Sequence, residues 1–183
     1  MTLMIHEVQD WMLDLDLSNF KTITFDDGLY SQYKHYNHFL KFNVPLYFFI
    51  STDIVCPENE IQNNEIISCE KAHIEYFTNN NKKNYMKWSQ IYEIYNTPNC
   101  FIGGHSHTHK RTKILPIKEQ IFTTKIETEQ MMENFNKNGI IIQSFCYPYN
   151  EESIGYKNVL KEFNVTDFFG KNRIPIESLK DMK

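Results

Sequence analysis

Several features that mark membrane, secreted or nucleic-acid-binding proteins are missing from this sequence. No window approaches eighteen consecutive apolar residues, so we expect no transmembrane helix. Residues 1–17 carry acids where a secretory signal has a basic segment, and they lack an unbroken apolar stretch. The four cysteines are scattered without a C-x-x-C pair, which favours free thiols in a reducing compartment. We therefore expect a cytoplasmic protein.

Charge of one sign is also sparse. The formal net charge is −4, and the Lys and Arg residues are scattered rather than clustered, so nucleic acid is not an expected partner. The composition, 41% hydrophobic and 23% charged, lies far from that of disordered chains. A chain of 183 residues fits one domain, which we place at 1–183; no pattern indicates an oligomeric state.

Segments of strand and helix character alternate along the chain. From short β-rich or continuous apolar runs we expect strands at 2–6, 22–25, 44–50, 100–102, 140–147 and 165–169. Helical spacing and stop signals predict helices at 29–42, 86–95, 116–137 and 153–163. Residues 57–84 have little periodicity and are expected to form an insertion or long loop with some helix. The alternation predicts an α/β fold with a mostly parallel sheet, open or closed into a barrel.

Polar and reactive side chains follow three of the expected strands. Asp26 and Asp27 end the second strand, His105 to His109 follow the fourth, and Tyr147-Pro148-Tyr149 ends the fifth. Because the carboxyl ends of parallel strands meet at one rim, we expect these residues in one crevice.

The spacing of His105 and His109 decides which backbone would let them share a metal. In a strand the two would lie about 13 Å apart, but on a helical turn only about 6 Å along the axis. We therefore expect a helical turn here, with Asp27 as the third ligand of one divalent metal. His107 would point to the opposite side of such a turn and is not expected to be a ligand. Zn²⁺ is the expected metal, although nitrogen and oxygen ligands also suit Co²⁺ and other divalent ions.

Adjacent carboxylates repel each other in one pocket unless a cation lies between them. A metal would keep Asp27 ionised and favour an ionised Asp26, which could then take a proton from activated water. The backbone N–H of Tyr147 could stabilise the resulting oxyanion together with the metal. Taken singly, these motifs have ordinary interpretations as a turn, a solvated face and a packing segment. Their shared position at strand ends favours a metal-dependent hydrolase.

The same motifs resemble those of the polysaccharide deacetylase family, the NodB-like domains of carbohydrate esterase family 4. Thr24-Phe25-Asp26-Asp27-Gly28 matches the T-F-D-D-G of the family, and His105-Ser106-x-x-His109 matches its H-[ST]-x-x-H. Residues 3–8, 44–49, 87–89 and 145–150 are similar to further family segments, so the resemblance runs from about residue 3 to about residue 170.

This resemblance implies a distorted or incomplete (β/α) barrel that removes an N-acyl, usually N-acetyl, group from an amino sugar or glycan precursor. The site residues that it implies are Asp26 as base, Asp27, His105 and His109 as metal ligands, Tyr147 as oxyanion donor through its N–H, and Pro148 and Tyr149 as substrate contacts. A cytoplasmic location favours a nucleotide-linked or lipid-linked precursor over a finished wall polymer.

Two departures from the family pattern bear on activity. Cys146 stands where many members have the arginine that pairs with the base, so Asp26 lacks an orienting partner unless Arg173 or another cation reaches it. No histidine follows His109, so the late L-x-L-x-H motif that supplies the general acid is absent. Either His6 replaces it or Asp26 acts as both base and acid. A catalytically silent metal-containing relative and a hydrolase of non-sugar amides are the alternative functions.

Overall fold

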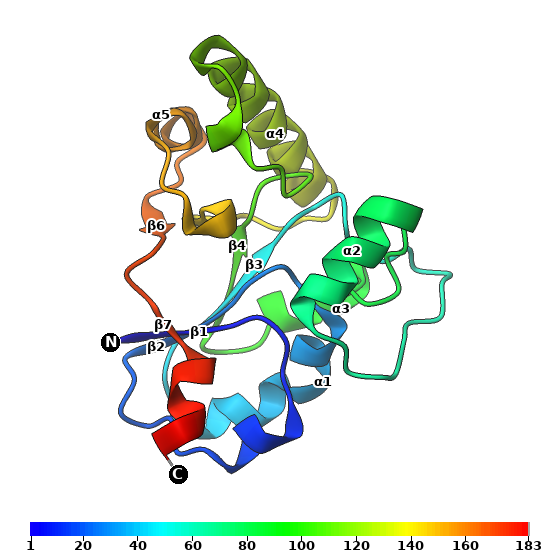
Figure 1. Ribbon diagram of the computed structural model, residues 1–183, viewed down its shortest axis with the longest axis vertical. Coiled ribbons are helices and arrows are strands. Elements are labelled where there is room, and N and C mark those ends of the chain that lie inside the picture. Colours follow the sequence, from blue (N-terminus) through cyan, green and yellow to red (C-terminus); the bar gives the residue numbers. More distant parts are fainter. Residues whose placement is uncertain (183) are drawn as a thin grey trace.

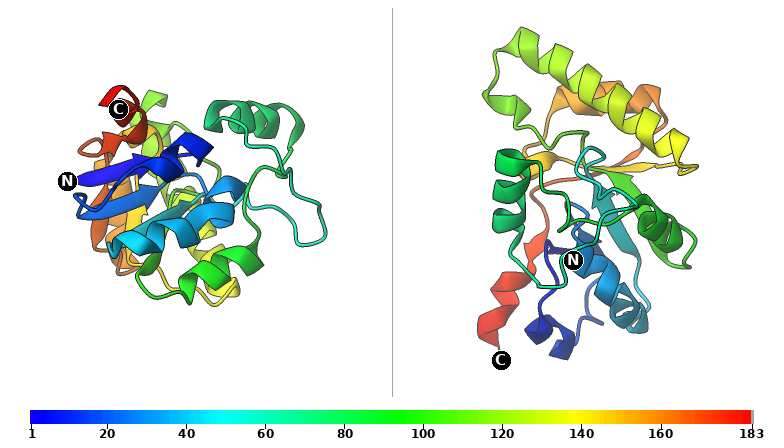
Figure 2. Two further views of the ribbon diagram at one scale, coloured as in Figure 1. Left: turned by 90° about the horizontal axis from the view of Figure 1, so that it is seen from below. Right: turned by 90° about the vertical axis from the view of Figure 1, so that its right-hand side faces the viewer.

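The computed structural model describes residues 1–182, and its centre is one parallel β-sheet. The strands are β1 (Thr2–Ile5), β2 (Thr22–Phe25), β3 (Leu46–Ile50), β4 (Cys100–Gly104), β5 (Ser144–Cys146), β6 (Asp167–Phe169) and β7 (Ile174–Pro175). They lie in the order β6-β5-β4-β3-β2-β1-β7, and each neighbouring pair is parallel. The sheet curls into an incomplete (β/α) barrel, which confirms the predicted fold class (Figures 1 and 2).

The barrel is open between its two edge strands. Strand order follows the chain from β1 to β6, and β7 then returns to the other edge, beside β1. Residues 170–173 therefore cross from one edge of the sheet to the other. This crossing places Arg173 directly before β7. β7 pairs with β1, and β1 pairs with β2, the strand that the Asp-Asp pair follows.

Helices connect the strands and cover the sheet (Figure 1). The α-helices are α1 (Tyr30–Phe39), α2 (Cys69–Asn79), α3 (Trp88–Tyr95), α4 (Ile117–Lys137) and α5 (Ile154–Glu162). Short 3-10 helices are η1 (Asp10–Asp14), η2 (Leu40–Phe42), η3 (Thr112–Ile114), η4 (Pro148–Asn150) and η5 (Ile176–Met182). Within residues 1–182, no helix combines the length and apolar character that a membrane crossing requires.

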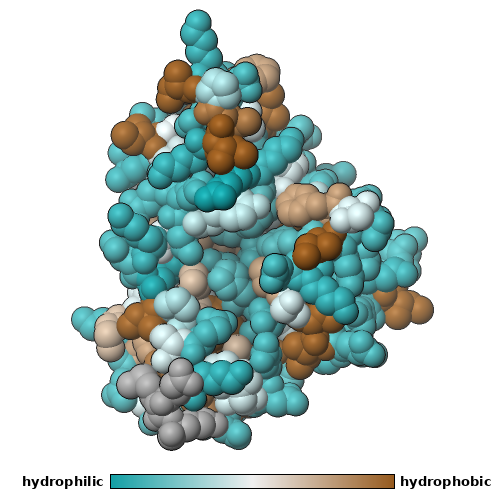
Figure 3. Space-filling model, in the orientation of Figure 1, coloured by the Kyte–Doolittle hydropathy of each residue, from teal (hydrophilic) through white to brown (hydrophobic). Residues whose placement is uncertain are grey.

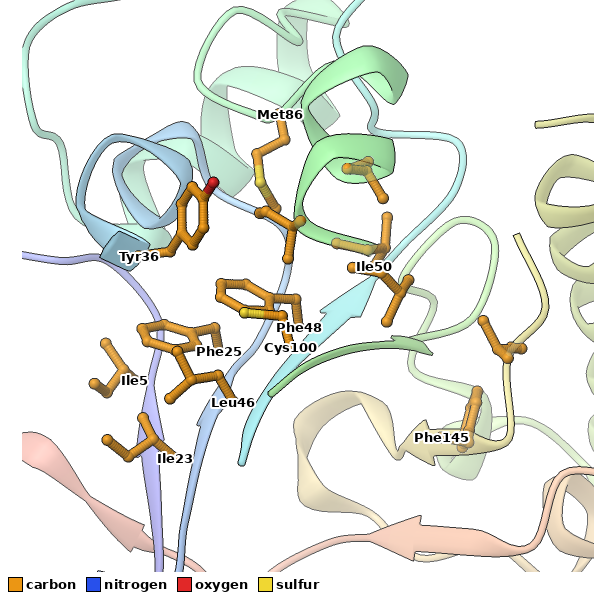
Figure 4. Packing of buried hydrophobic residues seen from close by; sticks show 14 of the residues in the cluster. Ile5, Ile23, Phe25, Tyr36, Leu46, Phe48, Ile50, Met86, Cys100 and Phe145 are labelled. Atoms are coloured by element: carbon orange, nitrogen blue, oxygen red, sulfur yellow. The ribbon is translucent and has the colours of Figure 1, made fainter. Parts of the chain in front are cut away.

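Apolar side chains from the strands form the main core (Figure 4). Phe25 on β2 stacks on Phe48 on β3 with ring centroids 4.6 Å apart, and it meets the edge of Phe39 on α1 at 5.1 Å. All three rings are fully buried. Each such ring contributes about 1.5–3 kcal/mol by burial, so this contact fixes β2, and the residues that follow it, against β3 and α1.

The observed strands differ from the prediction in two places. Residues 140–147 were expected to be one strand, but only Ser144–Cys146 is a strand, and its ladder to β4 is the single pair Gly104–Phe145. Ile140 and Ile142 are nevertheless buried, so the apolar pattern there reflects packing without strand pairing. The prediction also stopped at residue 169 and missed β7, an edge strand of two residues that is too short to show a pattern.

Residues 57–84, which the sequence predicted to be an insertion or long loop with some helix, consist of loop and the helix α2. Ser68 caps the helix by accepting a hydrogen bond from the N–H of Lys71 at 3.3 Å. Glu7 accepts a hydrogen bond from the N–H of Cys69 at 3.1 Å, which ties the start of α2 to the loop after β1. Ala72 and Tyr76 pack in a small second core cluster. The insertion thereby places one face of α2 beside the ends of β1 and β2.

The surface is mostly hydrophilic, with an apolar group at one end (Figure 3). Exposed apolar side chains gather over η3 and the start of α4, namely Ile114, Ile117, Ile121 and Phe122. This group lies at the opposite end of the molecule from η5, which is red in Figure 1.

Candidate active site

Five separate segments line one cavity of about 280 Å³ at the carboxyl ends of the strands. The lining residues are His6, Asp26 and Asp27 after β1 and β2, Cys69, Glu70 and His73 from α2, His105 and His109 after β4, and Tyr149 and Asn150 from η4. The structure thus brings together most of the residues that the sequence predicted, and it adds Cys69 and His73.

The Asp-Asp-Gly turn points its two carboxylates in different directions. Asp27 has φ 73° and Gly28 has φ 72°, so the chain takes a left-handed turn directly after β2. Glycine is favoured at position 28, because other residues rarely adopt this positive φ and because an added Cβ would lie 3.1 Å from Ile50 Cδ1. As a result, Asp26 faces Arg173 and Asp27 faces the histidines, although both are buried.

Three imidazole rings converge on one carboxylate oxygen of Asp27. The Nε2 atoms of His109, His105 and His73 lie 3.1, 3.2 and 3.7 Å from its Oδ1. This Oδ1 is buried without a hydrogen bond of acceptable geometry. Burial alone would raise the pKa of Asp27, but the histidines outweigh it and hold that pKa well below its usual value. The carboxylate is therefore ionised and surrounded by nitrogen donors.

A hydrogen bond to Cys146 fixes which nitrogen of His105 faces Asp27. Its Nδ1 lies 2.8 Å from the carbonyl oxygen of Cys146, so Nδ1 carries the proton and donates it. Nε2 faces the Asp27 carboxylate at 3.2 Å. Burial alone would lower the pKa of His105, but Cys146 and Asp27 outweigh it and raise that pKa, so Nε2 must lose its own proton before it can bind a cation. The donor set of imidazole nitrogen and carboxylate oxygen suits a divalent metal, and the bond to Cys146 orients His105 for it.

The close groups of ligand atoms differ from the predicted triad of Asp27, His105 and His109. Asp27, His73 and His109 each offer an atom within 4.8 Å of the other two, and Asp26, His105 and Cys146 form a second such group. His105 thus lies between the two carboxylates, with Nε2 against Asp27. The Nε2 atoms of His73, His105 and His109 nevertheless all lie within 3.7 Å of Asp27 Oδ1. The atoms that bind one metal must surround one point, and these atoms gather around this oxygen.

The loop that carries the histidines is not the helical turn that the spacing predicted. Ser106 and His109 have φ values of 67° and 57°, and both lie outside any helix. The hydroxyl of Ser106 accepts a hydrogen bond from the N–H of His109 at 3.0 Å. Buried Glu127 on α4 accepts hydrogen bonds from the N–H groups of His107 and Thr108 at 3.0 and 2.7 Å. These contacts hold a tight non-helical loop that brings both rings to Asp27.

His107 points away from the cavity, as the sequence predicted. Its Nδ1 lies 2.8 Å from the hydroxyl of Thr52, and its Nε2 lies 4.0 Å from Asp53. It is absent from the cavity lining described above. His107 therefore braces the loop rather than contributing to the group around Asp27.

Arg173 supplies the partner that the Asp26 carboxylate lacks in the sequence motif. Its two terminal nitrogens donate to the two oxygens of Asp26, each at 2.7 Å, and the side chains are 3% and 2% exposed. One of them also donates to Asn150 at 2.6 Å and contacts Cys146 Sγ at 3.0 Å. Burial would raise the pKa of Asp26, but Arg173 outweighs it and the pKa is lowered. Asp26 is held ionised in a fixed orientation, as a base requires.

Of the three predicted residues of the Tyr-Pro-Tyr segment, only Tyr149 lines the cavity. The N–H of Tyr147 donates to the carbonyl of Phe169 at 3.0 Å, within the β5–β6 pairing, so its predicted oxyanion role would require that bond to break. Pro148 is buried. Tyr149 lines the cavity, and its ring lies 4.7 Å from that of His109. Tyr149 is therefore the member of this segment that is placed to contact a substrate.

His6 lines the cavity, as its position after β1 predicted. His6 directly follows β1, which pairs with β2, so His6 and Asp26 lie at the same end of neighbouring strands. Its backbone carbonyl accepts a hydrogen bond from Gln32 at 2.6 Å, which fixes the chain at this point. His6 therefore lies in the same cavity as Asp26 and Asp27.

Sequence reasoning missed Cys69 and His73. The thiol of Cys69 donates to Asp27 Oδ2 at 3.1 Å, and the ring of His73 stacks on His109 with centroids 4.6 Å apart. Burial is the largest cause that lowers the pKa of His73 to about 4, so its ring is neutral at pH 7. A signal was present: Cys69 and His73 are four residues apart, and Ser68 before them is a helix cap.

Comparisons with known proteins agree with the fold. No protein-family model matches the sequence, and no curated protein matches it. The structure of IcaB from Ammonifex degensii is similar, with 17% identity, a TM-score of 0.61, and 88% of this chain and 70% of that chain covered. A de-N-acetylase from Aggregatibacter actinomycetemcomitans has 15% identity and a TM-score of 0.61, with coverage of 93% and 77%.

The match of greatest mutual coverage among these is the deacetylase PplD from Streptococcus pyogenes in complex with acetate. It is 13% identical to this chain with a TM-score of 0.59, and 100% of this chain and 97% of that chain are covered. At such identities the likeness concerns the fold. This chain therefore shares its fold with these structures, which include a de-N-acetylase and a deacetylase.

Proposed function

We propose that this protein is a metal-dependent hydrolase that removes an N-acyl group, usually N-acetyl, from an amino sugar or glycan precursor, with the chain as one catalytic domain. The observation that carries the proposal is the pairing of two differently held carboxylates in one cavity. Asp27 is surrounded by imidazole nitrogens, and Asp26 beside it forms an ion pair with Arg173. The fold shared with deacetylases supports the same reaction class.

The proposed metal ligands are Asp27, His105 and His109, with Zn²⁺ as the expected ion and Co²⁺ as an alternative. A divalent ion held there would lower the pKa of water and polarise the acyl oxygen. Three hydrogen bonds fix these ligands in place. The carbonyl of Cys146 accepts from His105, the thiol of Cys69 donates to Oδ2 of Asp27, and the hydroxyl of Ser106 accepts from the N–H of His109.

Asp26 is the proposed general base. Arg173 keeps it ionised at pH 7 and fixes both oxygens in space, so that their remaining lone pairs can accept a proton from water. Amide cleavage must also protonate the departing amine. The proton that Asp26 has accepted can be returned to that nitrogen, and His6 on the same rim is the other possible donor.

The size of the cavity bears on the substrate. About 280 Å³ is at the small end of ligand pockets, which range over about 300–1,000 Å³, so we expect one sugar ring with its acyl group to enter. Tyr149, half-exposed at the mouth, provides an aromatic face against which a sugar can pack. We extend the proposal to a glycan precursor met in the cytoplasm, which cell fractionation would test.

A catalytically silent relative remains the second candidate, and one observation weakens its case. It rests on two absences, the arginine that pairs with the base and, more seriously, the late histidine motif that supplies the acid. Arg173 takes the role of that arginine through two 2.7 Å contacts, from a different part of the chain. An enzyme is therefore the better-supported function.

The test compares Asp26→Asn with wild type, both loaded with Zn²⁺ or Co²⁺. Released acetate is measured on a panel of N-acetylated sugars and simple amides, and metal content is measured separately. We expect Asp26→Asn to keep its metal and lose about 10²–10⁴-fold in turnover, because an amide cannot accept the proton of water. Asp16→Asn, an exposed site, is the matched control. Retained turnover in Asp26→Asn would remove Asp26 from the mechanism, and activity on simple amides alone would redirect the substrate class.

A further inference from the structure

We propose that His73, on the inserted helix α2, is a fourth protein ligand of the metal at Asp27. This inference rests on the proposed metal site and extends it to a residue outside the T-F-D-D-G and H-S-x-x-H motifs. The insertion would then have a chemical role, because it completes the coordination of the ion.

The first argument is the position of two unsatisfied atoms. His73 Nε2 and Asp27 Oδ1 are both buried without a hydrogen bond, and they lie 3.7 Å apart. Two ligand atoms on a tetrahedral zinc, each about 2.0–2.1 Å from it, are separated by about 3.3 Å. The observed distance is close to that value and too long for a hydrogen bond. An ion bound to Oδ1 would satisfy both atoms at once.

The second argument is the alignment of His73 with an expected ligand. Its ring stacks on that of His109 with an interplanar angle of 15°, and the Nε2 atoms of both rings approach Asp27 Oδ1. Asp27, His73 and His109 each offer an atom within 4.8 Å of the other two. The Nδ1 atom of His73 lies 3.4 Å from Cys69 Sγ, whereas its Nε2, which faces Asp27, has no hydrogen-bond partner.

The third argument is that α2 is held in register with Asp27. One helical turn before His73, the thiol of Cys69 donates to Asp27 Oδ2 at 3.1 Å, and the N–H of Cys69 donates to Glu7 at 3.1 Å. Cys69 therefore occupies the second oxygen of Asp27 and leaves Oδ1 to the ion. Positions i and i+4 lie on one helix face, so the contact of Cys69 also orients His73.

A fourth protein ligand changes what the site must do in catalysis. Three imidazoles and one carboxylate fill the four positions of a tetrahedral zinc, and water then needs a fifth position. The placement of α2 would thus set the coordination number of the resting enzyme.

The experiment counts imidazole ligands directly. Metal-free protein is loaded with Zn²⁺, the number of bound imidazoles is measured by X-ray absorption, and affinity is measured by competition with a chelator. We expect three imidazoles in wild type and two in His73→Ala, with affinity lower by at least about tenfold, the lower bound seen for outer-shell partners. His107→Ala is the matched control, because His107 lies on the loop of His105 and His109 but points to Thr52. This variant should keep three imidazoles.

The outcomes separate this inference from the proposed function. Two imidazoles in wild type, falling to one in His109→Ala but unchanged in His73→Ala, would overturn the role of His73 and leave the proposed site standing. The same holds if His73→Ala lowers activity without changing affinity or the imidazole count. The wild-type count needs no variant, so it decides the point even if His73→Ala fails to fold. Wild type that binds no Zn²⁺ or Co²⁺ would refute the metal site itself.

Discussion

Replacing Arg173 by methionine tests how the buried pair with Asp26 is balanced. The pair makes two charge-assisted contacts of 2.7 Å, and both side chains are almost fully buried. Methionine fills similar space but leaves the carboxylate without its counter-charge. Removing one partner of a buried pair costs about 3–5 kcal/mol, because the remaining charge is desolvated without compensation. We expect the free energy of unfolding of Arg173→Met to fall by about that amount.

The assay is urea unfolding of the metal-free protein, which separates this effect from metal binding. Arg173→Met/Asp26→Asn removes both charges, and we expect it to recover much of the loss, since no unpaired charge stays buried. Arg111→Met is the control, because Arg111 pairs with Glu151 at 2.6 Å while it is half-exposed. Solvent screens that pair, so its removal should change the free energy of unfolding little.

The pH dependence gives a second, sign-sensitive readout. In wild type, Arg173 holds the pKa of Asp26 below its unfolded value of about 3.9, so the stabilisation is present above that pH and is lost as pH falls through the folded pKa. In Arg173→Met, burial dominates and the pKa of Asp26 should rise. The variant should therefore gain stability as pH falls towards about 4, opposite to wild type. A loss no larger than that of Arg111→Met, or an unchanged pH slope, would refute the balance described for this pair.

Two further predictions concern protons at the site. Burial alone would lower the pKa of His105, but contacts with Cys146 and Asp27 hold it well above its usual value, so protons compete with metal. Metal affinity should rise with pH while His105 loses its proton, and calorimetry in buffers of different ionisation enthalpy should show proton release; affinity independent of pH would contradict this. His6→Ala should leave the rate within about tenfold if Asp26 serves as both base and acid, since a positioned acid contributes about 10²–10⁴-fold. A drop beyond about a hundredfold, with metal and fold intact, would instead assign the acid to His6.

The sequence alone predicted the strands from β1 to β6, four of the five α-helices and much of the group around one rim. Burial patterns with periods of two and 3.6 residues are local, so they can be read along the chain. Parallel strands end at a common edge, which is why Asp27, His105 and His109 could be expected together, and the structure places both rings within 3.2 Å of Asp27 Oδ1.

Only the tertiary structure decided how the site is completed. Arg173 lies 147 residues from Asp26 and reaches it because the chain crosses the open edge of the barrel between β6 and β7. His73 comes from the insertion, whose sequence shows little periodicity, and its orientation depends on how Glu7 and Cys69 dock α2.

Backbone geometry at the rim was also set by long-range contacts. The loop of His105 and His109 is non-helical because Glu127, from the distant helix α4, satisfies its N–H groups and stabilises its left-handed residues. The N–H of Tyr147 is taken by Phe169 through the pairing of β5 with β6. Spacing along the chain fixes which residues can meet at an edge. Which hydrogen bond each group finally makes depends on partners that are remote in sequence, and these are chosen only when the elements pack.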